Sequence, residues 1–139
     1  NEYIRMLGAE LIPHFNDAYE VLDVNTSFDL KFDFYCGHDN ALINLSIVLY
    51  TMAGVSIFNV GTTPVRLSKG AHSGILKIPG KLLNDDVYTI SLYFVKDTAS
   101  VVYVIDELLT FEVVDEPRDN AWFGKWPGAV RPSLEFSIK

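Results

Sequence analysis

A cysteine and a histidine two positions apart are the first candidates for chemistry in this 139-residue chain. Cys36 and His38 have the residue types of a thiol nucleophile and its base. Side chains at positions i and i+2 share a face only while a strand continues, and Gly37 is expected to end the strand between them. No G-x-S-x-G motif supplies a serine nucleophile instead. We therefore expect Cys36 to be an inert, buried thiol.

Two polar turns carry residue types that ligate metals, His38-Asp39-Asn40 and Asn84-Asp85-Asp86. Neither has the ligand spacing of an EF-hand loop or a zinc site. Asx-rich turns commonly use these side chains for backbone hydrogen bonds. Glycine-rich phosphate motifs are absent, and no pair of acids is marked by its context as a glycosidase pair. The sequence predicts a non-catalytic chain with no metal and no cofactor.

One predicted sheet face combines hydroxyl, amide and tyrosine side chains. It is built by the strands expected at Ile43–Met52, Val87–Val95 and Leu108–Val114. The side chains expected on its solvent side are Asn44, Ser46, Val48, Tyr50, Thr89, Ser91, Tyr93, Thr110 and Glu112. Aromatic rings stack on the apolar faces of sugars, and short polar groups exchange hydrogen bonds with sugar hydroxyls. The alternative is an ordinary solvated face, since Thr, Ser and Tyr favour strands in any case.

In the carbohydrate interpretation, Tyr50 and Tyr93 stack on sugar rings. The hydroxyl-reading residues are Asn44, Ser46, Thr89, Ser91 and Glu112.

Alternation of apolar and polar residues predicts the elements that position this face. In Ser27–Cys36 every second residue is apolar, and the same period recurs through the three strands above. Further strands are expected at Tyr3–Ile12, Val55–Val60, Ala71–Ile78 and Val130–Ile138. A period of two is typical of strands with one face in a core, and no sustained helical stripe is present. We predict an all-β, antiparallel β-sandwich.

The last part of the chain has a different composition. We assign residues 1–116 to the sandwich core, and 117–139 to a Pro/Gly/Trp arm with a terminal strand in the same domain. Trp122 and Trp126 can anchor the arm on the sandwich, form a ligand platform or lie in a subunit interface. A strand at the end of such an arm can dock on its own sheet or exchange with a second subunit.

Composition excludes several partners. The net charge of −7 disfavours nucleic acid and anionic lipid, and favours neutral over anionic sugars. No run of about 18–20 apolar residues is present, which predicts a soluble protein. The single cysteine cannot form an internal disulfide and favours a reducing compartment. Asn1 in the first position, where a Met is expected, indicates a piece of a longer protein.

The order of several segments resembles the C-terminal domain of Wzt-type proteins, the ATP-binding subunits of ABC transporters that export O-antigen polysaccharide. The segments are INLSIVLY at 43–50, LLNDDVYTISL at 82–92, LTFEVVD at 109–115 and WPGAVRP at 126–132. Phe136 stands where such domains usually carry a Trp.

This resemblance implies an immunoglobulin-like sandwich that recognises O-antigen polysaccharide and forms a homodimer by exchanging its terminal strands. It also implies a cytoplasmic location at the inner face of the bacterial inner membrane. There the parent protein would supply an ATPase domain and contact the membrane-spanning transporter subunit. The arm residues expected at the dimer contact are Trp122, Trp126, Arg131, Leu134 and Phe136. The alternatives are an adaptor sandwich that binds another protein, and a small hydrolase that uses acidic residues.

Overall fold

The structure of the chain is a computed structural model that describes residues 1–15, 21–116 and 125–139. Within these residues it contains eight strands and no helix. The strands are β1 (Ile4–Pro13), β2 (Phe28–Cys36), β3 (Ala41–Thr51), β4 (Ser56–Gly61), β5 (Val65–Leu67), β6 (Gly70–Ile78), β7 (Asp86–Lys96) and β8 (Ser100–Val113).

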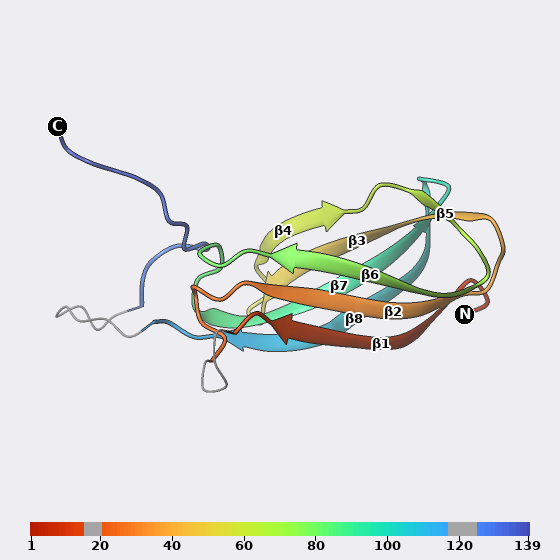
Figure 1. The fold of residues 1–139 in the computed structure, drawn as a ribbon, viewed down its shortest axis with the longest axis horizontal. Helices are drawn as coiled ribbons and strands as arrows, with labels where there is room; N and C mark the ends of the chain where they lie inside the picture. The colour runs from red at the N-terminus through yellow and green to blue at the C-terminus, as the bar shows by residue number, and fades with distance from the viewer. Residues whose placement is uncertain (16–20, 117–124) are drawn as a thin grey trace.

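The strands form two antiparallel sheets that face each other (Figure 1). One sheet has the order β1-β2-β6, and the other has the order β4-β3-β7-β8, with β5 paired to the beginning of β3. These orders correspond to A-B-E and C′-C-F-G of an immunoglobulin-type sandwich. The predicted all-β, immunoglobulin-like sandwich is therefore confirmed.

The predicted alternation places the core between the two sheets. Every second residue of β2 from Phe28 to Cys36 is buried, as the sequence pattern requires. Aromatic rings join the layers: Phe34 of β2 meets Phe94 of β7 edge to face at 5.0 Å, and Phe28 meets Phe111 at 5.4 Å. Edge-to-face pairs of this kind add to the stabilisation that burial alone provides. Cys36 is buried, and its thiol donates to the carbonyl of His38.

A buried tyrosine fixes the corner before β7. The hydroxyl of Tyr88 donates to the carbonyl oxygen of Asn84 at 2.7 Å, and Tyr88 is 1% exposed. This arrangement is the tyrosine corner of immunoglobulin-type domains, in which a Tyr at the start of strand F bonds to the backbone upstream. The pKa of Tyr88 is raised to about 12, mainly by burial and to a smaller extent by the nearby carboxylates of Asp86 and Asp85.

Two glycines stand where the backbone of another segment comes close. A Cβ at Gly37 would lie 2.0 Å from the carbonyl oxygen of Glu2, and the Gly37 N–H donates to Tyr3. A Cβ at Gly80 would lie 2.1 Å from the carbonyl oxygen of Asn25. The two close approaches hold the N-terminal strand and the segment before β2 against the sandwich.

Two expectations about the elements need correction, and one short strand was not expected. The strand expected at Leu108–Val114 begins earlier, at Ser100, because its pairing with β7 continues on the other side of a bulge. The short strand β5 carries no alternation long enough to be recognised.

The strand expected at Val130–Ile138 is not formed in the single chain, where only Val130 makes an isolated bridge, to Leu83. Beyond Pro132 the chain extends away from the sandwich (Figure 1), and none of the strands in the described residues pairs with it.

Candidate functional site: the outer face of the five-stranded sheet

Two tyrosines project from the outer face of the five-stranded sheet. In the β3–β7 pairing Tyr50 faces Thr89, Val48 faces Ser91, and Ser46 faces Tyr93. Tyr50 and Tyr93 therefore lie on the same face, on either side of the Val48–Ser91 pair. Desolvation by partial burial raises the pKa of Tyr93 above its usual value, and the nearby Tyr50 hydroxyl and the charge of Asp106 raise it further. The two side chains thus reach toward each other across the face, and we call them the tyrosine pair.

Two of the predicted hydroxyl-reading residues lie beneath this surface. Thr89 is 8% exposed and Ser91 is 4% exposed. The Thr89 hydroxyl donates to the carbonyl of Leu109 at 3.1 Å, and the Ser91 hydroxyl donates to the carboxylate of Asp106 at 2.8 Å. Both hydroxyl groups thus donate hydrogen bonds to β8, Thr89 to a backbone carbonyl and Ser91 to a carboxylate.

Polar side chains border the tyrosine pair on both sides. Toward β4, the Ser46 hydroxyl donates to the side-chain oxygen of Asn59 at 2.9 Å. Toward β8, Asp106 is exposed, and its carboxylate accepts the hydrogen bond from the Ser91 hydroxyl. Neither Asn59 nor Asp106 is among the residues predicted from the sequence. The alternation of Val55–Val60 could have indicated Asn59, whereas Asp106 lies before Leu108, where the last core strand is expected to begin.

The remaining predicted residues of this face lie toward its two ends. Asn44 is half-buried and faces Val95, whereas Glu112 is exposed and faces Val87. Val87 and Val95 are eight residues apart on β7, which is roughly 26 Å at ~3.3 Å per residue. The structure therefore groups Ser46, Tyr50 and Tyr93 at the centre, and a single small sugar cannot contact both ends.

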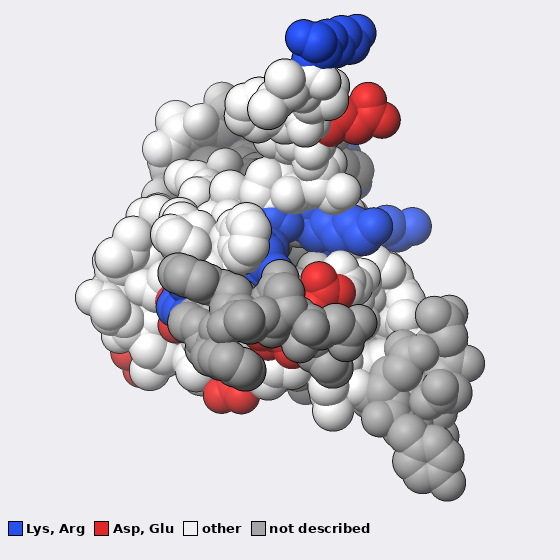
Figure 2. Space-filling model, turned by 90° about the vertical axis from the view of Figure 1, so that its left-hand side faces the viewer, with Lys and Arg blue, Asp and Glu red and all other residues white. Residues whose placement is uncertain are grey.

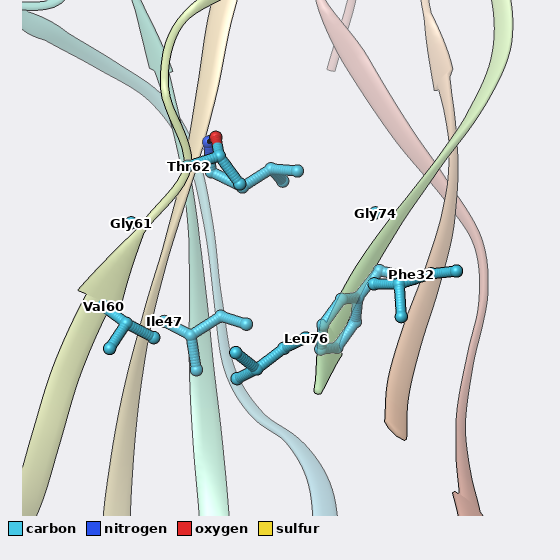
Figure 3. Close-up of a pocket in the computed structure, with 9 residues that line it drawn as sticks. Phe32, Ile47, Val60, Gly61, Thr62, Gly74 and Leu76 are labelled. Carbon is cyan, nitrogen blue, oxygen red and sulfur yellow. Dashed lines mark hydrogen bonds between the residues drawn. The ribbon is translucent and has the colours of Figure 1, made fainter. Parts of the chain in front are cut away.

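An apolar cavity of about 210 Å³ lies elsewhere, between the two sheets where they separate at the edges of β4 and β6 (Figure 3). Both strands are at the edge of their sheets. The side chains and backbone that line the cavity belong to Phe32, Leu45, Ile47, Val60, Gly61, Thr62, Gly74, Ile75 and Leu76. Apart from Thr62 these residues are apolar or glycine, so the cavity offers packing and few hydrogen bonds.

Residues 126–131 of the arm are fixed to the end of the sandwich. The side-chain amide of buried Asn84 donates to the carbonyls of Trp126 and Gly128, both at 2.7 Å. Arg131 bonds to the carboxylate of Asp115 at 3.0 Å and lies 4.8 Å from the ring centre of Trp126. Trp126 therefore helps to anchor the arm, while Trp122 lies outside the described residues.

At the end of the arm the apolar side chains are exposed. The exposed fractions of Leu134, Phe136 and Ile138 are 80%, 98% and 100%. Figure 2 views this end of the sandwich, and the projecting segment at the top is mostly uncharged. The two predicted contact residues Leu134 and Phe136 are thus separate from Trp126 and Arg131, which pack on the body of the chain.

The comparison with solved structures relates this architecture to a known protein. A crystal structure described as the C-terminal domain of wzt superposes with a TM-score of 0.73. The match covers 100% of this chain and 86% of the other, at 11% sequence identity. The chain has the fold of the C-terminal domain of Wzt. The resemblance noted in the sequence is thereby confirmed at the level of fold.

Sequence comparisons add nothing to the Wzt likeness. No protein-family model matches the chain, and a search of curated proteins finds no match. Among the described residues, no helix is long and apolar enough to cross a membrane. The likeness to Wzt is therefore a likeness of three-dimensional arrangement.

Proposed function

We propose that this chain is a non-catalytic carbohydrate-binding domain that recognises O-antigen polysaccharide for export by an ABC transporter. The tyrosine pair carries the proposal, because it offers two adjacent aromatic faces bordered by hydrogen-bonding side chains. Tyr50 and Tyr93 stack on the apolar faces of sugar rings, and the Ser46–Asn59 pair accepts and donates hydrogen bonds beside them. The Wzt-like fold supports the assignment to polysaccharide export.

In this proposal the domain acts as the C-terminal domain of an ATP-binding subunit. It is held in the cytoplasm at the inner face of the bacterial inner membrane, and the parent protein contacts the membrane-spanning subunit. The Wzt-like fold is the support for this placement.

The binding test is calorimetric titration of the protein with O-polysaccharide purified from the bacterium that encodes it. We expect saturable binding by the wild-type chain and at least a tenfold loss for Tyr50→Ala combined with Tyr93→Ala. Tyr35→Ala is the matched control, because Tyr35 lies on β2 of the other sheet. Unchanged affinity in the double variant would exclude this site. No binding by the wild type would exclude the function, and release of new reducing ends would favour the hydrolase alternative.

We also propose that two copies associate through the end of the arm. Ser133–Lys139 alternates apolar and polar residues, and its three apolar side chains are exposed. The three-stranded sheet lacks the fourth strand that immunoglobulin constant-type sheets place beside strand E, and this position is the free edge of β6. The apolar cavity opens at the same edge. Strand addition at a free edge supplies backbone hydrogen bonds, and the cavity receives the apolar side chains.

The energetics favour this arrangement. Burying three large apolar side chains stabilises a complex by roughly 5–8 kcal/mol before the entropic cost of association. Because each copy offers both a tail and an edge, the exchange is symmetric and closes at two subunits. Two carbohydrate sites on one dimer would then bind a repeating polysaccharide with greater avidity than one.

Light scattering on the intact chain tests the association. We expect a dimer that becomes a monomer when residues 133–139 are removed, and also when Ile75→Asp places a charge at the edge of the cavity. Ile75 is 57% exposed, so this change does not disturb the core. Lys77→Asp, on an exposed position of the same strand outside the cavity lining, is the control. A wild-type monomer, or a dimer that survives removal of the tail, contradicts the exchange.

If mutation of the tail abolishes association while no glycan binds, the adaptor alternative is favoured. The two experiments therefore separate a carbohydrate-binding domain from a sandwich that serves only oligomerisation.

A further inference from the structure

The β-bulge in β8 lies directly beside the tyrosine pair. Ile90 faces Leu109 and Leu92 faces Ile105, so the single residue Ser91 on β7 corresponds to three residues on β8. The middle one of the three, Glu107, has a φ of 52°. Non-glycine residues in this left-handed region are uncommon and cost free energy, and bulges of this kind re-aim side chains next to functional sites.

Asp106 is the first of the three bulge residues and lies on the outer face, next to Ser91. The carboxylate of Asp106 accepts the hydrogen bond from buried Ser91 through Oδ1, which fixes its position in the sheet. Asp106 is itself exposed. The influence of Asp106 on the pKa of Tyr93 also places its charge close to the tyrosine pair. A fixed carboxylate with accessible lone pairs beside two aromatic rings is an acceptor for hydroxyl or ammonium hydrogens.

The basic residues of this sheet lie away from the carboxylate. Within β3, β4, β5, β7 and β8 the basic side chains are Arg66 and Lys96. Arg66 donates to the carbonyl of Asn40, and the Lys96 ammonium lies 4.5 Å from the ring centre of Tyr3. Both residues pair near the beginning of β3, where Leu42 faces Arg66 and Ile43 faces Lys96. Neither basic side chain of this sheet is therefore placed beside the tyrosine pair, where it could neutralise an acidic ligand.

We propose that Asp106 is the specificity-determining residue of the tyrosine-pair site, and that it selects uncharged, hydroxyl-rich sugars over sugars carrying a carboxylate or phosphate. This inference rests on the proposed carbohydrate function and names the class of its ligand. The Asp106 carboxylate accepts hydrogen bonds from two hydroxyls of a ring stacked on Tyr50 or Tyr93. An anionic group at the same place meets a like charge that neither Arg66 nor Lys96, the basic residues of this sheet, compensates, and its binding is disfavoured.

The test uses the whole chain and three sets of probes. These are neutral oligosaccharides of mannose, galactose and rhamnose, oligogalacturonates as carboxylated sugars, and mannose 6-phosphate oligosaccharides as phosphorylated sugars. We expect the wild type to bind a neutral member at least tenfold more tightly than any anionic one. Asp106→Asn keeps the shape and removes the charge, and we expect it to lose about tenfold for the neutral ligand. Because the repulsion disappears as well, anionic sugars should bind the variant as tightly as the wild type or more tightly.

Glu112→Gln is the matched control, because Glu112 is an exposed carboxylate on the same face of β8 near its end. Equal loss in Glu112→Gln would mean that net charge, and not Asp106, sets the preference, which overturns the inference. It is also overturned if Asp106→Asn binds like the wild type while Tyr50→Ala with Tyr93→Ala loses binding. In that case the carbohydrate function survives. If the wild type binds none of these probes and not its own O-polysaccharide, the function fails and the inference fails with it.

Discussion

Replacing Tyr88 by Phe tests whether the tyrosine corner stabilises the fold as the structure indicates. The change removes the 2.7 Å hydrogen bond from the Tyr88 hydroxyl, and the carbonyl oxygen of Asn84 loses this donor. The site is buried, since Tyr88 is only 1% exposed. An unsatisfied buried acceptor costs about 1–3 kcal/mol, so we expect Tyr88→Phe to lower the free energy of unfolding by roughly 2 kcal/mol. For a domain of this size the midpoint of thermal unfolding should fall by about 5–10 °C.

The pH dependence of this effect gives a sharper measurement. The pKa of Tyr88 is raised from 10.0 to about 12 in the folded chain, so the folded state holds this proton more tightly than the unfolded state. The resulting stabilisation is fully present below pH 10 and is lost as the pH rises through about 12. Linkage gives it an upper limit of about 2.7 kcal/mol. The difference in unfolding free energy between wild type and Tyr88→Phe should therefore shrink between pH 10 and 12.

Urea unfolding, followed by circular dichroism at several pH values, measures both effects. Tyr103→Phe is the control, since Tyr103 is only partly buried and stacks on Phe94 at 6.1 Å. We expect it to change stability by less than about 0.5 kcal/mol. The reasoning is refuted if Tyr88→Phe is as stable as the wild type, or if the difference between the two stays constant up to pH 12.

Three further predictions concern the packing of the arm and the N-terminal strand. Asn84→Ala removes both hydrogen bonds to the carbonyls of Trp126 and Gly128, and tryptic cleavage at Lys125 should become at least fivefold faster; an unchanged rate contradicts this anchoring. Arg131→Lys keeps the charge but loses the planar contact with Trp126, and urea unfolding should show a loss of about 1 kcal/mol. Gly37→Ala places a Cβ against the Glu2 carbonyl and should destabilise the fold by about 3 kcal/mol or more. Its control is Gly8→Ala, which should have little effect because a Cβ at Gly8 meets no atom within 4 Å. Equal stability of the two variants refutes the close approach at Gly37.

The core strands were predictable because their signal is local. Alternation in Phe28–Cys36 and Tyr88–Phe94 follows from the two-residue period of a strand, and burial of one face follows from the hydrophobic effect. The same period assigned Tyr50 and Tyr93 to an outer face. Asp106 was not assigned to that face, because the strand expected from the sequence begins only at Leu108, whereas pairing with β7 extends β8 back to Ser100.

The tyrosine corner was missed for a similar reason. Tyr88 alternates with Thr89 like any core residue, and the sequence does not reveal that its hydroxyl reaches the carbonyl of Asn84. The end of the arm is the opposite case. The alternation of Leu134, Phe136 and Ile138 has the period of a strand, yet a strand needs a neighbouring backbone to pair with. In residues 1–15, 21–116 and 125–139 of the one chain, no strand pairs with them.

The sequence by itself determined the all-β class, the inward and outward faces of the long strands, the acidic surface and the distinct composition of the arm. These properties depend on side-chain type and on a period of two, which neighbouring residues carry. Only the tertiary structure decided the sheet order, the meeting of Tyr50 with Tyr93, the direction of Asp106 and the free edge of β6. Each of these depends on pairing between segments far apart in the chain, and the register of that pairing places the chemical groups of the outer face side by side.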